Sequence, residues 1–539
     1  MMLIRIALKQ QTVGLIALGL AGVLGGVLNA LAFIQIAGTT PAERAAFAQQ
    51  MTLLGAQLSY MLPVPVHIDT LSGYLEWRLF GFIVLVYAIW AAIAGSGSGR
   101  GDEERGLVEQ WLAAGVGRTR YIITRVAVFA AVATVVIGAM QLSILLSAGG
   151  EPLPAGELLA MAVNLLAATL CSYGIALVIA QLVTTRRAAG GIAAGLLIAL
   201  FLINGAGRTA DLGAVRWLSP FYHFERSRPL TNAGSLDVGA ISVLFGAAVV
   251  LTTIGIVTFA RRDLGGTALP GASRESRATR SPSRDPLLRL PVLGPLRQQR
   301  IWVAAWLVGF VALSASLISI TRTIVDSLTS SEVPFLRAYF DRAGLGVYDS
   351  FVGVIWLSTA MLLLSAYAII QVASWSADDA EGRLATILSA PVSHARVILE
   401  RLATLLVAVG LIAAASAVAV YVVAAGQGIT LDGGRVALAA ALLLTIPFAF
   451  GSIGQFVSAS RPRIAVVALS AVAVLSYFVQ QFVPLFDLPD WVANLSLYTL
   501  FGTPMSGDIK WGGVAGLVGI GTVATAASLI ALRQRDVGA

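Results

Sequence analysis

Charged residues are scarce in this chain, and hydrophobic residues are abundant. Asp, Glu, Lys and Arg make up 12% of the 539 residues, and hydrophobic residues make up 57%, whereas a soluble domain carries roughly 25% charged residues. Apolar runs of about 20 residues recur along the whole length, and each is long enough to cross a ~30 Å hydrocarbon layer. A soluble core of that size would need far more polar surface to cover it. We therefore predict an all-α polytopic membrane protein.

The residues that build disulfides and metal sites are also nearly absent. Cys171 is the only cysteine, and His67, His223 and His394 are scattered without ligand spacing. These numbers exclude an internal disulfide framework and a CxxC metal site, and they give no reason to expect a bound metal.

Lysine occurs only twice, which limits nucleotide chemistry. A P-loop needs a lysine followed by Ser or Thr, but Lys9 is followed by Gln10 and Lys510 by Trp511. This sequence therefore contains no P-loop, and any ATP hydrolysis has to come from another chain.

Twelve apolar runs between charged or Gly/Pro-rich breaks are candidate spans. They fall near 13–36, 77–97, 121–147, 157–184, 188–206, 237–260, 301–321, 350–375, 397–425, 434–459, 464–484 and 512–532. When the chain is threaded through them, most of the 36 Lys and Arg residues lie on the side that holds both termini. The positive-inside rule makes that side the cytoplasmic face of the cell membrane. The excess positive charge then faces anionic lipid, and no nucleic-acid partner is expected.

The two halves of the sequence repeat each other in order. Four short matches occupy equivalent positions in the two sets of six spans: 8–11 with 296–299, 102–125 with 378–401, 218–219 with 495–496, and 262–265 with 535–538. Such a series indicates a duplication. Because each half has an even number of spans, both halves keep the same orientation, as in parallel-repeat transporters.

These matches predict three parts. A first six-span half covers 1–262, a Pro/Ser/Arg-rich cytoplasmic linker covers 263–295, and a second six-span half covers 296–539. Arg5 and Lys9 lie four residues apart at the start of the first half, a spacing that predicts a short interfacial "elbow" helix over 1–11.

The repeated stretch between the second and third spans of each half has the most informative pattern. It opens with acidic residues, continues with an apolar stripe, breaks at Gly115 or Pro391 and ends with basic residues. This order matches the dipole of a short helix. One interpretation is a solvated loop with topogenic charge. The other is an amphipathic helix that docks into a partner's groove.

Residues 102–118 and 378–394 resemble the coupling-helix region of ABC-2-type permeases. That family's pattern is an acidic pair, a glycine, and then Leu-x-x-Pro-Val-x-Arg leading into the third span. The double length, with an Arg-Asp-Leu-Gly-like ending to each half, is similar to permeases described as exporters of polyketide antibiotics. Two residues depart from the pattern: Gly115 replaces the proline in the first copy, and His394 replaces the arginine in the second.

The resemblance implies a type V exporter-like fold, with coupling helices at 104–116 and 381–392. It implies a separate ABC ATPase subunit in two copies, which would bind ATP and Mg²⁺, so no cofactor is expected in this chain. The residues that the resemblance assigns to ATPase coupling are Glu103, Glu104, Gly106, Trp111, Leu112, Val116, Arg118 and Arg120, and Asp379, Glu381, Gly382, Ile387, Leu388, Pro391, Val392, His394 and Arg396.

The same resemblance places spans 1, 2 and 5 of each half along a central path. Its candidate lining residues are Asn29, Trp90, Asn204, Tyr367, Gln371 and Tyr477. An uncharged, partly aromatic lining suits a lipophilic solute, although most polar residues within spans only bond neighbouring helices.

Two other classes of protein remain open. An ion-coupled secondary carrier of the major-facilitator type also has twelve spans and a 6+6 duplication, but such carriers usually hold an ionisable residue inside a span. Here Glu76, Glu157 and Asp349 lie at span edges. A membrane-embedded enzyme would need a cluster of His, Asp or Glu, and no such cluster stands out, so no catalytic residue is predicted.

Overall fold

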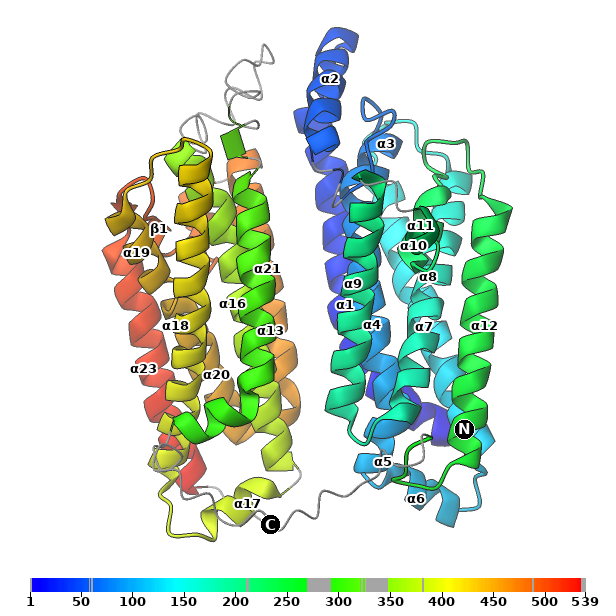
Figure 1. The fold of residues 1–539 in the computed structure, drawn as a ribbon, viewed down its shortest axis with the longest axis vertical. Helices are drawn as coiled ribbons and strands as arrows, with labels where there is room; N and C mark the ends of the chain where they lie inside the picture. The colour runs from blue at the N-terminus through cyan, green and yellow to red at the C-terminus, as the bar shows by residue number, and fades with distance from the viewer. Residues whose placement is uncertain are drawn as a thin grey trace. The chain divides into compact units, whose positions relative to one another are not determined.

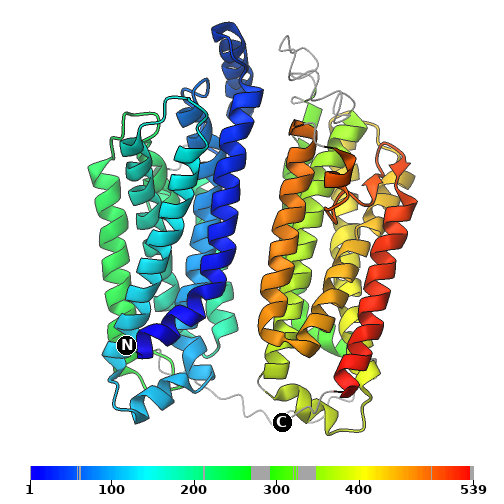
Figure 2. The same cartoon turned by 180° about the vertical axis from the view of Figure 1, so that it is seen from behind.

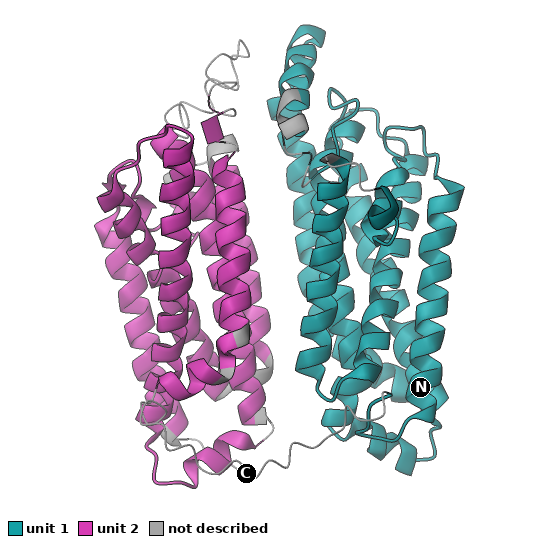
Figure 3. Ribbon diagram, in the orientation of Figure 1, with its two compact units in different colours: residues 1–279 teal, residues 280–539 magenta. Residues whose placement is uncertain are grey.

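The computed structural model describes residues 2–57, 59, 62–209, 213–268, 292–319, 321–322, 325, 348–380, 382–486 and 489–534. The chain forms two compact units, Met1–Thr279 and Arg280–Ala539, which Figure 3 colours separately. Most of the predicted linker, 263–295, lies outside the described residues.

Within these described ranges, twelve helices are long and apolar enough to cross a membrane, six in each unit. In unit 1 they are α1 (Met2–Ile36), a second span described below, α7 (Arg118–Leu146), α8 (Ala155–Leu182), α9 (Arg186–Thr209) and α12 (Val238–Arg261). The second span is a continuous helical run of α3 (Leu71–Leu75), the π-helical segment η1 (Glu76–Phe80), α4 (Gly81–Ser96), the π-helical segment η2 (Gly97–Gly101) and α5 (Asp102–Glu104). Outside the spans lie α2 (Pro41–Gln57), α6 (Leu107–Ala113), α10 (Gly213–Arg216) and α11 (Pro220–Arg226). Figure 1 places α6 at the end of unit 1 that carries the N-terminus, and α11 towards the other end.

Unit 2 repeats this order. Its spans are α13 (Leu293–Ser319), α16 (Tyr348–Ala380), α18 (His394–Gly426), the pair α19 (Gly433–Leu442) and α20 (Thr445–Ser460), α21 (Pro462–Phe486) and α23 (Trp511–Gln534). The shorter elements are α17 (Arg383–Leu388), α22 (Asp490–Ala493) and an antiparallel hairpin of β1 (Gly502–Thr503) and β2 (Asp508–Ile509). The predicted all-α membrane fold with two tandem six-helix repeats is confirmed.

Equivalent helices pack together in the two units. In unit 1, α8 packs against α12 and α4, and α1 packs against α7. In unit 2, α20 packs against α23 and α16, and α13 packs against α18. Glycines permit close approach in both: a Cβ on Gly255 would lie 2.7 Å from Leu177, and one on Gly454 would lie 2.4 Å from Val372. Small residues at helix contacts are the usual way in which membrane helices approach each other.

Spans 2 and 8 are longer than predicted. The sequence predicts that they end near 97 and 375, but the helical runs continue to Glu104 in unit 1 and to Ala380 in unit 2. The short helices α6 and α17 begin directly after Gly106 and Gly382, whose φ angles are 66° and 73°. Glycine adopts this left-handed conformation without steric cost. The chain therefore turns at the same point in both copies.

The predicted elbow helix is the first part of α1, not a separate element. Helix α1 begins at Met2 and is continuous to Ile36, and Figure 2 shows its first turns lying at an angle to the rest. Ala7 and Gln11 are buried on this segment, whereas Arg5 and Lys9 are exposed. One face of the segment thus packs on the helices of unit 1, and the basic residues point away.

A buried serine fixes the segment that follows the fifth span in each unit. Ser219 Oγ donates to the carbonyl of Leu200 at 3.0 Å and accepts from the amide of Phe221 at 3.2 Å. Ser496 makes the same two bonds, to Ser476 at 2.8 Å and from Tyr498 at 3.1 Å. The sequence match at 218–219 and 495–496 therefore corresponds to one repeated structural contact.

We expect Ser219→Ala and Ser496→Ala to lower the free energy of unfolding by similar amounts, about 1–2 kcal/mol each, because each loses the two hydrogen bonds of a buried serine hydroxyl. Thermal unfolding in detergent measures the effect, and the exposed Ser235→Ala is the control. A marked loss from only one of the two serines would contradict their structural equivalence.

Candidate functional site

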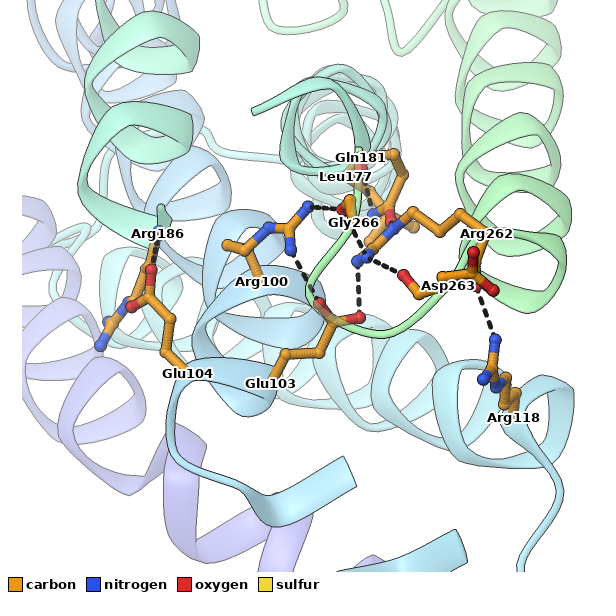
Figure 4. Close-up of polar contacts among 10 residues, drawn as sticks. All are labelled: Arg100, Glu103, Glu104, Arg118, Leu177, Gln181, Arg186, Arg262, Asp263 and Gly266. Carbon is orange, nitrogen blue, oxygen red and sulfur yellow. Dashed lines mark hydrogen bonds and ion pairs between the residues drawn. The ribbon is translucent and has the colours of Figure 1, made fainter. Parts of the chain in front are cut away.

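The end of span 2 carries a buried carboxylate, Glu103, between two guanidinium groups (Figure 4). Arg100 Nη1 lies 2.9 Å from Glu103 Oε2, Arg262 Nη2 lies 2.6 Å from Oε1, and all three side chains are at most 4% exposed. Glu103 is one of the residues predicted to contact an ATPase, and its carboxylate is buried and paired with two guanidinium groups of its own unit. Such pairing offsets part of the cost of burying charged groups, and it connects the end of span 2 to Arg262 at the end of α12.

Arg262, at the end of α12, joins this carboxylate to three other parts of unit 1 (Figure 4). Its Nε donates to Gln181 Oε1 on α8 at 2.8 Å, and its Nη1 donates to the carbonyl of Gly266 at 3.0 Å. Its own carbonyl accepts from Arg118 Nη1 at 2.6 Å. Arg118, predicted as an ATPase contact, thus binds the residues that follow span 6.

Asp102 forms a second buried cluster beside Glu103. Its Oδ2 lies 2.9 Å from Arg125 Nε and accepts from Tyr121 Oη at 2.9 Å, and its Oδ1 accepts from Arg105 Nη2 at 2.8 Å. Asp102 is fully buried and the Arg125 side chain is 4% exposed. Arg125 also donates to the carbonyl of Ala7 at 3.4 Å, which connects the first turns of α1 to the end of span 2.

Glu104, in contrast, is exposed. Its Oε1 accepts from the backbone amide of Arg186 at 2.5 Å, at the first residue of α9 (Figure 4). A carboxylate is favourable there because the first amides of a helix lack partners within the helix. Glu104 therefore contacts the start of span 5 and remains accessible to a partner.

Helix α6 packs on unit 1 through a residue that the sequence prediction did not include. Val108 is fully buried, whereas Trp111, Leu112 and Val116 are partly buried against the core. The predicted apolar stripe is thus shared between the unit's own core and its surface. The remaining predicted positions, Gly106 and Arg120, are partly exposed and exposed respectively.

Helix α17 in unit 2 has the same pattern of buried and exposed residues as α6. Leu384, which aligns with Val108, is buried, and Ile387 is 43% exposed. Among the other predicted positions, Gly382, Pro391 and Arg396 are exposed, and Asp379, Leu388, Val392 and His394 are partly buried, while Glu381 lies outside the described residues. Each short helix therefore has one buried aliphatic anchor and an accessible outer surface.

A family model described as "Multidrug efflux system permease Rv1217c, C-terminal domain" matches residues 4–260 and 288–533. The chain belongs to this family. The match covers both repeats in turn, and the prediction of a fused, double-length ABC-type permease is confirmed. A comparison with curated proteins gave no match.

The path residues predicted in the first half of the permease are mostly internal to unit 1. Trp90 is 6% exposed and packs against the Phe129 ring at a centroid distance of 5.1 Å. Asn204 is fully buried and donates to Glu225 Oε1 at 2.8 Å. Asn29 is partly buried and donates to the carbonyl four residues before it. Trp90 and Asn204 thus stabilise the unit, and only Asn29 reaches its surface.

The second half of the permease gives a similar result. Tyr367 is 1% exposed and packs edge-on against Trp306, and Gln371 is 5% exposed and donates to Gln299 Oε1 at 2.7 Å. Tyr477 is partly exposed. The Gln371 contact joins span 8 to the first turns of α13, so its structural role is clear, and Tyr477 is the most accessible of the three.

Sequence analysis missed a charge cluster near α11. Glu225 pairs with Arg208, which also donates to the carbonyl of Ser59 at 2.7 Å, and Arg216 Nη2 lies 3.7 Å from Glu225 Oε2. The cluster connects the end of span 5 to Ser59 and to the segment that carries α10 and α11. Its partners are separated in sequence by loops, and no repeated motif marks them. Among the described residues, no group of three or more His, Cys, Asp or Glu is placed to hold a metal.

Proposed function

We propose that this permease is the membrane subunit of an ATP-driven exporter that moves a lipophilic antibiotic-, drug- or lipid-like solute outward. Separate ATPase subunits, one at each repeat, dock on the coupling segments 104–116 and 381–392 at the cytoplasmic face. ATP and Mg²⁺ are bound by those subunits.

The observation that carries this proposal is the pair α6 and α17. Both are short helices outside the spans, both follow a left-handed glycine, and both are anchored by one buried aliphatic residue. A solvated loop needs neither the anchor nor its duplication. Short helices presented in this way are suited to docking in a partner's groove, and their two copies match two ATPase subunits.

The source of energy and the type of solute are supported by other features. This sequence contains no P-loop, so ATP-driven transport requires a second chain. The family description names multidrug efflux, which supports outward transport of drug-like solutes. Tyr477 and Asn29, the path candidates that are accessible on their units, are uncharged, as a lipophilic solute prefers.

The first experiment is an affinity pull-down of the permease from its native membrane, followed by identification of the co-purified subunits and a transport assay in proteoliposomes. We expect a P-loop ATPase to co-purify, and we expect efflux of a lipophilic dye to require ATP. Recovery of the chain alone, with transport that survives ATP depletion, would replace this proposal with an ion-coupled carrier.

A further inference from the structure

Both ends of the α6 segment in unit 1 are attached to one residue, Arg262. Glu103, four residues before α6, pairs with the Arg262 guanidinium at 2.6 Å. Arg118, the first residue of α7 after α6, donates to the Arg262 carbonyl at 2.6 Å. Arg262, which follows the last residue of span 6, therefore contacts the chain both before and after α6.

The residues after Arg262 strengthen this attachment. The carbonyl of Gly266 accepts from Arg100 Nη2 at 2.6 Å and from Arg262 Nη1 at 3.0 Å. The amide of Ala268 donates to the carbonyl of Gln181 at 2.9 Å. Residues 262–268 thus run back over the ends of spans 2 and 4. We call these residues, together with Arg100 and Glu103, the clasp.

A helix as short as α6 has no independent stability, because seven residues are too few to offset the cost of helix nucleation. Its position is determined by what holds it. The three side chains of the ion-pair core are at most 4% exposed, and buried ion pairs are costly to separate. A force applied to α6 is therefore transmitted to α8 and α12 and is not absorbed by local bending.

Unit 2 differs from unit 1 at two of the corresponding positions, whereas Glu103 and Arg262 align with Asp379 and Arg535, of which Arg535 lies outside the described residues. Ser376 stands where unit 1 has Arg100 and bonds Ser458 at 2.8 Å, and His394 stands where unit 1 has Arg118. The repeated ion pair is also weaker: Arg401 lies 3.7 Å from Asp378 with side chains 18% and 28% exposed, whereas its counterpart in unit 1 is 2.9 Å and almost fully buried. Among the described residues, the contacts at these three positions thus differ between the two repeats.

We propose that Arg262 and Glu103 are positioning residues that make α6 move as one body with α8 and α12, so that the first coupling site is the mechanically stiffer of the two. This inference rests on the proposed ATPase coupling for its functional consequence. The mechanical part does not depend on an ATPase and can be measured on the permease alone.

Amide hydrogen exchange of the purified full chain tests the mechanical part. In the wild type, we expect residues 107–117 to exchange more slowly than 383–393. Arg262→Gln should raise exchange in 107–117 by at least about tenfold, and the adjacent exposed Arg261→Gln should leave it unchanged. Glu103→Gln, which preserves shape, is the second variant in case Arg262→Gln does not fold. Equal exchange of the two segments in the wild type, or unchanged exchange in both clasp variants, would overturn the proposal.

The functional part is tested in proteoliposomes with the co-purified ATPase, by measuring dye efflux and ATP hydrolysis in the same sample. We expect Arg262→Gln and Glu103→Gln to lower the dye transported per ATP severalfold while ATPase binding is retained, with Arg262→Lys partly restoring the ratio. A normal ratio together with faster exchange would overturn the coupling role. If the wild type itself shows no ATP-dependent efflux, the exporter proposal fails, and the exchange result alone decides whether the clasp exists.

Discussion

Asp102→Ala is expected to destabilise unit 1 by about 3–5 kcal/mol, the cost of leaving one member of a buried ion pair without its partner. Arg125, Arg105 and Tyr121 all contact the Asp102 carboxylate. The carboxylate is fully buried and the Arg125 side chain is 4% exposed, so water cannot reach the Arg125 guanidinium to solvate it once the carboxylate is removed. Since Arg125 also bonds Ala7, the first turns of α1 should loosen with it.

The matched variant is Asp378→Ala in the second repeat. Asp378 pairs with Arg383 at 2.8 Å and with Arg401 at 3.7 Å, and all three side chains are at least 18% exposed, so its cost should be about 1 kcal/mol or less, as for exposed pairs. Thermal unfolding of the two variants in the same detergent makes the comparison, with Asp102→Asn separating loss of charge from loss of volume. Equal shifts for the two alanine variants would contradict the difference in burial.

The spans and the duplication could be predicted because they depend on local properties of the chain. Apolar runs mark helices that must satisfy their backbone groups within the bilayer, and the predicted span centres agree with the observed helices. The short helices α6 and α17 could also be predicted, because both lie in the repeated stretches 102–125 and 378–401. Gly106 and Gly382 align, and their positive φ angles explain why both copies carry glycine there.

The direction in which individual side chains point could not be predicted. Asp102 and Glu103 have the pattern of an exposed acidic helix start, but they are buried because Arg125 and Arg262 reach them from distant parts of the sequence. Val108 was overlooked beside the larger Trp111, since a helix of seven residues is too short to define its buried face by periodicity.

The hydrogen-bond partners of the path candidates could not be predicted for a related reason. A polar or aromatic residue in an apolar run can line a path or bond a neighbouring helix, and composition does not separate these cases. Asn204 and Gln371 are bonded within their own units by Glu225 and Gln299. Glu225 lies on α11 and Gln299 on α13, so neither partner belongs to the span of the residue that it bonds.

The second large effect is expected at α17, where Ile387→Glu should reduce ATPase association about a hundredfold. Ile387 is 43% exposed on a helix outside the spans, and burying an isoleucine in a partner's cleft contributes about 2 kcal/mol, which is roughly thirtyfold in affinity. A carboxylate in the same apolar cleft adds a desolvation cost. Pull-down of the co-purified ATPase and ATP-dependent dye efflux are the measurements.

The fold of unit 2 should tolerate this change, because the anchor of α17 is Leu384 and not Ile387. Thermal unfolding of Ile387→Glu should therefore equal that of the wild type, and Ile387→Leu should keep both binding and efflux. Thr386→Glu, which adds the same charge at the neighbouring exposed position, should have the smaller effect. Wild-type ATPase recovery with Ile387→Glu would mean that α17 does not enter a cleft of the ATPase, and the docking role would then pass to α6 alone.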